Sequence, residues 1–168
     1  FFNKRALAIC LFVCTFFSFN SKAQVIYGYS TFPFVTSQNT GFYSHIAYKI
    51  NVPANVTINQ LGIDVGTVTT QQVILSLYSD LYDYPASVIA VTAATTLITG
   101  QNRINLTSPV KLVPGNYWIA YSSNAIFPIG LTATTGSIAW KSSAFVSFGS
   151  TPEPFGSQFS STTGTPSL

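Results

Sequence analysis

Charged residues are scarce in this chain, which has seven Lys or Arg and four Asp or Glu among its 168 residues. Three of the cations, Lys4, Arg5 and Lys22, lie in the first 23 residues, so the remainder of the chain has a net charge of zero. Nucleic-acid binding depends on clustered cations that release counterions from the phosphates. The four scattered cations that remain cannot supply the free energy of counterion release, so we expect no nucleic-acid partner.

Groups that could perform catalysis are also few. The single His45 has no local motif of a serine triad around it. A glycosidase needs two carboxyl groups that flank one bond, but Asp80 and Asp83 lie in one turn, and Glu153 lies between two prolines. We therefore expect no enzyme, no catalytic residues, no cofactor and no metal ion. No second His, Cys or carboxylate that could bind a metal lies near His45 in the sequence, so His45 is interpreted as an ordinary surface residue.

The first 23 residues have the pattern of a secretory signal peptide. Lys4 and Arg5 precede an apolar run over residues 6–19, and the stretch Ser21-Lys22-Ala23 has small residues at the cleavage-determining positions. The run is shorter than the roughly 20 residues of a membrane span. The ending SKAQ resembles signal peptides of the Bacteroidetes, which implies a Gram-negative bacterium. We expect a secreted or cell-surface protein with no membrane span in the mature chain.

The chain has only two cysteines, Cys10 and Cys14, and both would leave with the signal peptide. The mature domain is therefore expected to form neither a disulfide nor a thiolate metal site. The chain does not begin with Met, and its last residues have no closing element, so we interpret it as a fragment at both ends. The expected organisation is a signal peptide (1–23), one domain (24–150) and a Ser/Thr/Pro/Gly-rich tail or loop (151–168).

The mature chain does contain repeated period-two alternation, and it lacks helical spacing. In the stretch 45–52, Ile46, Tyr48, Ile50 and Val52 share one face. The stretch 56–65 changes phase near Asn59-Gln60, which predicts a β-bulge. Further strands are expected at 73–78, 87–93, 103–106, 110–112, 117–122, 138–140 and 145–148, separated by turn residues such as Ser108-Pro109 and Pro128. Short strands at this spacing predict an all-β, antiparallel, jelly-roll-like β-sandwich.

From residue 48 to residue 122 the order of features resembles a jelly-roll domain of secreted bacterial proteins, of the choice-of-anchor type, whose function is unknown. The matching residues are Leu61-Gly62-Ile63, Leu77-Tyr78-Ser79-Asp80, Pro85, Gly100, Asn102, Pro109-Val110, Leu112, Gly115 and Tyr117-Trp118. The family usually has a Gly before the proline of the hairpin, where this chain has Leu81-Tyr82-Asp83-Tyr84. The resemblance implies an exported binding, adhesive or architectural module and transfers no catalytic residue.

Three aromatic residues are the candidate ligand-binding residues. Ile119 is expected to point to the core, which places Trp118 on the outer face or in a groove, where its ring could stack on a sugar. Trp is also a residue that is often buried. Tyr82 and Tyr84 lie on an expected hairpin tip together with Asp80 and Asp83, which could stabilise the turn or hold calcium.

Two functions fit these observations. The first is a non-catalytic extracellular binding or adhesion module that recognises a surface or extracellular glycan through the exposed aromatics Trp118, Tyr82 and Tyr84. The alternative is an architectural spacer domain of a larger exported surface protein, in which the same aromatic rings belong to the core. Exposure of the three rings distinguishes the two.

Overall fold

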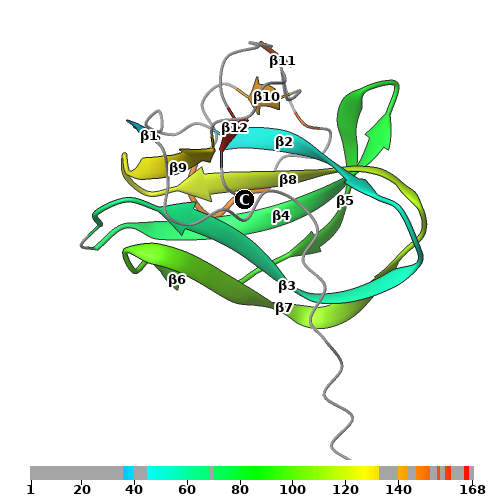
Figure 1. The fold of residues 1–168 in the computed structure, drawn as a ribbon, viewed down its shortest axis with the longest axis horizontal. Coiled ribbons are helices and arrows are strands. Elements are labelled where there is room, and N and C mark those ends of the chain that lie inside the picture. The colour runs from blue at the N-terminus through cyan, green and yellow to red at the C-terminus, as the bar shows by residue number, and fades with distance from the viewer. Residues whose placement is uncertain are drawn as a thin grey trace, which may run out of the picture.

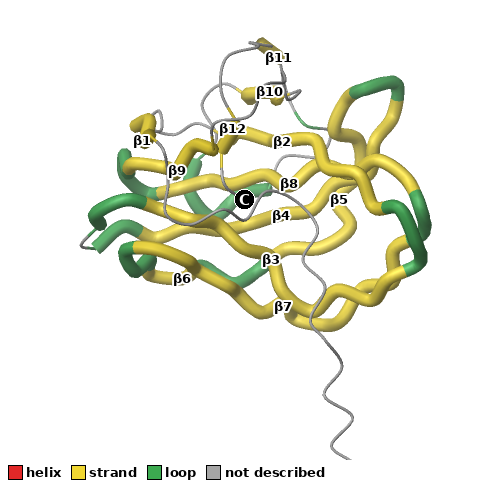
Figure 2. The backbone as a smooth tube through the Cα atoms, viewed as in Figure 1, coloured by secondary structure: helices red, strands yellow, loops and turns green. Residues whose placement is uncertain are grey.

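The computed structural model describes residues 36–39, 45–68, 70–132, 140–143, 147–151, 155, 158–159 and 165–166. The expected signal peptide, Cys10, Cys14 and Glu153 lie outside these residues. All regular structure in the described part is β-strand (Figure 2), and the strands pair in antiparallel fashion in two sheets that pack against each other (Figure 1). The expected fold class, an all-β antiparallel sandwich, is confirmed.

The first sheet has five strands. Its order is β1 (Thr36–Asn39), β9 (Pro128–Thr132), β3 (Val56–Val65) and β7 (Gly100–Leu112), and β12 (Thr165–Pro166) also pairs with β9. The second sheet has seven strands. Its order is β11 (Gln158–Phe159), β10 (Trp140–Ser143), β2 (His45–Val52), β8 (Gly115–Ser123), β4 (Gln72–Leu81) and β5 (Tyr84–Val91), and β6 (Thr95–Thr96) also pairs with β4.

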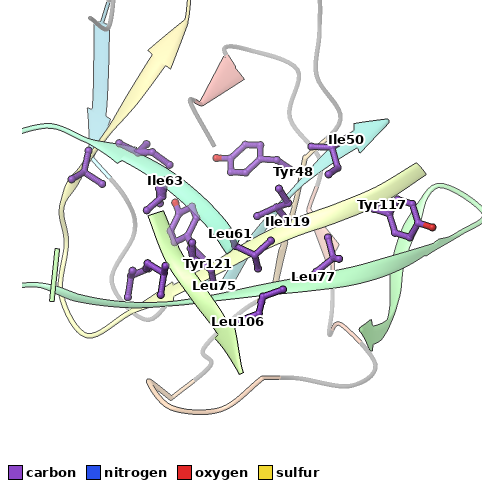
Figure 3. Close-up of a cluster of buried hydrophobic side chains, with 14 of the residues drawn as sticks. Tyr48, Ile50, Leu61, Ile63, Leu75, Leu77, Leu106, Tyr117, Ile119 and Tyr121 are labelled. Carbon is purple, nitrogen blue, oxygen red and sulfur yellow. The ribbon is translucent and has the colours of Figure 1, made fainter. Parts of the chain in front are cut away.

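The main hydrophobic core lies between the two sheets, where alternate residues of facing strands meet (Figure 3). The expected inward face of β2 is confirmed, because Tyr48, Ile50 and Val52 are buried in this core and Ile46 packs against it. Strand β8 contributes Ile119, as expected. The other central members are Leu61, Ile63, Val65, Val73, Leu75, Leu77, Ile104, Leu106, Tyr117 and Tyr121.

The pairing of β3 with β7 has an irregularity at the expected place. Ile58 pairs with Val110 and Gln60 pairs with Asn105, so the register shifts between these two positions of β3. The additional residues lie in β7, where the expected turn at Ser108-Pro109 instead belongs to one continuous strand. The expectation of separate strands at 103–106 and 110–112 is therefore wrong. Proline lacks the N–H of a strand ladder, and a bulge in an edge strand tolerates this loss.

Four further expectations differ from the structure. Pro128 was expected in a turn but begins β9, and β5 begins at Tyr84, three residues before the expected start. Of the expected strand 145–148, only Ser147 and Phe148 are described, and they lie outside the strands. The segment 151–168, expected as a tail or loop, contains β11 and β12, which pair with β10 and β9.

Candidate functional site

The tip of the β4–β5 hairpin has an unusual backbone conformation. Leu81 pairs with Tyr84, so Tyr82 and Asp83 form a two-residue loop, and their φ angles are 51° and 67°. Two-residue hairpin loops with two positive φ angles favour Asn-Gly or Asp-Gly. A residue with a Cβ atom in this region costs roughly 1–2 kcal/mol. The loop therefore stores backbone strain that a glycine would relieve.

This strained tip is also the most exposed aromatic element in the described part of the chain. Tyr82 is 88% exposed, and Tyr84 and Leu81 on either side of the loop are exposed as well. The hairpin projects beyond the neighbouring strands (upper right in Figure 1). The expected exposure of Tyr82 and Tyr84 is confirmed. Whether they contact a ligand stays a prediction.

A lysine from another strand binds this tip. Lys49 lies on β2, and its ammonium Nζ bonds to Oδ1 of Asp83 in the loop. The same Nζ lies 3.5 Å from Oδ1 of Asp80 and 5.7 Å from the centroid of the Trp118 ring. Partial burial lowers the pKa of Lys49, but the hydrogen bonds and charges of Asp83 and Asp80 outweigh it, and the pKa is raised above its ordinary value. Lys49 therefore stays charged and holds the loop against β2.

Trp118 lies on the expected face of β8 but is buried, so the expectation of an exposed ring is wrong. Its exposed fraction is 0%, and its Nε1–H donates to Oδ1 of Asp80 at 2.6 Å. A second hydrophobic cluster covers this outer face of the seven-stranded sheet and includes Tyr78 and Phe155. Trp118 therefore supports the base of the tip through Asp80 and is not itself an exposed contact.

His45 is buried as well, so its interpretation as a surface residue is wrong. Its Nε2 lies 3.1 Å from the hydroxyl of Tyr78, and its ring lies 5.1 Å from that of Phe155, centroid to centroid. Burial lowers the pKa of His45 to about 4. Its imidazole is therefore neutral at pH 7. Phe155 and Tyr78 pack against the imidazole and bury it. The local sequence of β2 does not indicate these contacts.

Carboxylates are dispersed over the two sheets. Asp80 and Asp83 both interact with Lys49, whereas Asp64 is buried on β3 and accepts a hydrogen bond from Nη1 of Arg103 at 3.0 Å. Within the described ranges, no group of three or more His, Cys, Asp or Glu side chains could hold a metal ion. The carboxylates of Asp80 and Asp83 are thus paired with the ammonium group of Lys49.

Sequence reasoning missed Lys49 as a partner of the tip. The only available signal was the position of Lys49 on the polar face of the stretch 45–52, and this does not identify Asp83 as its partner. Trp140 and Lys141 lie in β10, where Trp140 pairs with Tyr48, but their side chains are outside the described part.

No protein-family model, curated protein or solved structure matches this chain. The resemblance to choice-of-anchor jelly-roll domains therefore stays a prediction. Within the described ranges, no helix has the length and apolar character needed to cross a membrane.

Proposed function

We propose that the protein is a non-catalytic extracellular binding or adhesion module that contacts a glycan through the β4–β5 hairpin tip. The observation that carries this proposal is an 88% exposed tyrosine, Tyr82, held in a strained two-residue loop by Lys49. Strained backbone persists where the surrounding structure enforces it, and it concentrates at functional sites. A glycine at position 82 would be the stable choice for a turn that only connects two strands.

The chemistry of the tip suits sugar recognition. The rings of Tyr82 and Tyr84 offer apolar faces for the C–H groups of a pyranose. The exposed carboxylate of Asp83 and the partly exposed ammonium of Lys49 lie beside them and can bond to hydroxyl groups. The ion pair fixes the loop before a ligand arrives, which lowers the entropy cost of binding. Trp118 contributes indirectly, because it holds Asp80 beneath Lys49.

The second candidate is an architectural spacer in a larger exported surface protein. The burial of Trp118 favours it, because one of the three aromatic residues expected to contact a ligand belongs to a packed cluster. In a spacer, the tip would be an incidental surface loop. Substitutions in it would then alter stability alone.

The experiment compares Tyr82→Gly with the full chain for retention on an array of immobilised bacterial and host glycans. We expect the variant to lose at least tenfold in affinity for the glycan that the full chain retains. Its free energy of unfolding should rise by about 0.5–1 kcal/mol, since glycine adopts a positive φ without steric cost. Ile126→Ala, which removes an exposed apolar side chain from another loop, is the matched control and should retain binding.

Lys49→Gln tests the positioning role of the lysine. The glutamine removes the charge that holds Asp83, so the affinity should fall while Tyr82 and Tyr84 remain in the chain. Retention of the same glycan by the full chain, Tyr82→Gly and Lys49→Gln alike would refute the tip as the contact element. Absence of retention for every glycan and every variant would favour the spacer.

A further inference from the structure

The outer face of the seven-stranded sheet has small side chains at its centre. Ala47 on β2 pairs with Ala120 on β8, which pairs with Ser76 on β4. One step along the same face, His45 pairs with Ser122. Trp118 and Ile74 are buried on the same face. We call the outer-face patch the six other buried residues of this face: His45, Ala47, Ser76, Tyr78, Ala120 and Ser122.

An aromatic ring of the protein itself covers this patch. Phe155 is 3% exposed and packs with Ala47, Ala120 and Trp118 in the outer hydrophobic cluster. Its ring centroid lies 5.3 Å from that of Tyr78, with the two planes at 89°. The ring of Phe155 thus packs over the small side chains at the centre of this face.

The hydrogen-bonding groups of the patch do not suit a phenyl ring. Three buried side-chain atoms in the described part of the chain have no hydrogen-bond partner: Nδ1 of His45, Oγ of Ser76 and Oγ of Ser122. All three belong to the outer-face patch, on three neighbouring strands. Buried polar atoms are nearly always paired, and unpaired ones cost stability. Alanine at positions 76 and 122 would fit the same space without this cost.

We propose that the outer-face patch is a second binding site, that its ligand is a pyranose ring, and that Phe155 occupies it in the ligand-free conformation. The alanine methyl groups and the neighbouring rings would receive the C–H groups of the sugar. The two serine hydroxyls and Nδ1 of His45 would bond to its hydroxyl groups, each of which can donate and accept. The neutral state of His45 suits an uncharged ligand.

This inference takes its ligand class, a glycan, from the proposed function but uses a different part of the molecule. Because Phe155 must leave before the sugar enters, the apparent affinity of the protein is reduced by the fraction of molecules that are open. A substitution that removes the phenyl ring therefore raises the affinity. An ordinary core phenylalanine would not behave in this way.

The test titrates the full chain and its Phe155→Ala variant with the methyl pyranosides of glucose, galactose, mannose and N-acetylglucosamine, by calorimetry. Benzene is the apolar control probe. We expect Phe155→Ala to bind at least one pyranoside at least tenfold more tightly than the full chain does. Adding Ser76→Ala and Ser122→Ala to Phe155→Ala should weaken this binding at least fivefold without lowering the stability. If Phe155→Ala does not fold, Phe155→Leu replaces it under the same criteria.

Binding of benzene but of no pyranoside by the Phe155 variant would overturn the inference, because the space would then be an ordinary apolar cavity. Equal pyranoside affinity with and without Phe155 would overturn it as well. The hairpin tip is tested separately in the same titration. If Tyr82→Gly binds the pyranoside as the full chain does, the affinity belongs to the patch, and a failure of the tip proposal leaves this inference standing.

Discussion

Replacing Ser122 by alanine should make the protein more stable, whereas the same replacement at the next residue, Ser123, should make it less stable. Both side chains are buried, with exposed fractions of 1% and 2%. The hydroxyl of Ser123 donates to the carbonyl oxygen of Ala125 at 2.9 Å. The hydroxyl of Ser122 has no partner among the described residues. Each substitution removes one oxygen atom, so the pair isolates the effect of the hydrogen bond.

The magnitudes follow from the two environments. Burying a hydroxyl without a partner costs about 1–3 kcal/mol, so Ser122→Ala should raise the free energy of unfolding by about 1 kcal/mol. A satisfied hydrogen bond contributes about 1 kcal/mol, so Ser123→Ala should lower it by a similar amount. The two variants should thus differ by about 2 kcal/mol.

Urea denaturation followed by tryptophan fluorescence measures this difference. The midpoints should move in opposite directions while the dependence on urea stays constant, because the surface exposed on unfolding does not change. A loss of about 1 kcal/mol or more in Ser122→Ala would refute the reasoning. It would mean that the Ser122 hydroxyl is hydrogen-bonded in solution. The outer-face patch would then have two unpaired polar groups for a ligand instead of three.

Two more substitutions test other parts of the structure. Burial lowers the pKa of His45 from 6.5 to about 4, so the unfolded chain binds the extra proton first as the pH falls. The neutral, buried His45 contributes its full share to the free energy of unfolding above about pH 6.5. About 3 kcal/mol of this free energy is lost as the pH falls to 4. Urea denaturation at pH 7, 5.5 and 4 should show this loss in the full chain but not in His45→Gln. Gly62→Ala should cost on the order of 2 kcal/mol in the same assay, because its Cβ would lie 2.7 Å from Nη1 of Arg103 and displace the guanidinium from buried Asp64. Gly115→Ala, whose Cβ would meet only an ordinary contact at 3.9 Å, should cost less than about 0.5 kcal/mol, and equal losses at the two glycines would contradict this account.

Strands with one buried face were predictable from the sequence. His45–Val52 and Val56–Val65 have the expected ends, because alternation of apolar and polar residues is strong there and turn residues separate the two strands. Prolines caused the clearest errors. Pro109 was interpreted as part of a turn, but it lies in a bulge of β7, and Pro128 begins a strand.

The candidate site was predictable only in its local features. Exposure of Tyr82 and Tyr84 follows from their place at the tip of a short hairpin between two strands. The burial of Trp118 and His45 does not follow from their own strands. Both lie on the outer face that Phe155 packs against, and Phe155 belongs to a segment expected to be a tail. Alternation identifies the face of a sheet on which a side chain lies, but it carries no information about what covers that face.

The cover that Phe155 provides has a consequence for how motion in this protein can be observed. The strands beneath it pair on both sides, β2 with β10 and β8, and β4 with β8 and β5. Departure of the phenyl ring would therefore leave their backbone hydrogen bonds intact. Amide hydrogen exchange would therefore detect no opening, even if the Phe155 ring moved away from the sheet many times each second. A thiol introduced at position 120 would react with a labelling reagent only during such openings, so its reaction rate would report a motion that the backbone conceals.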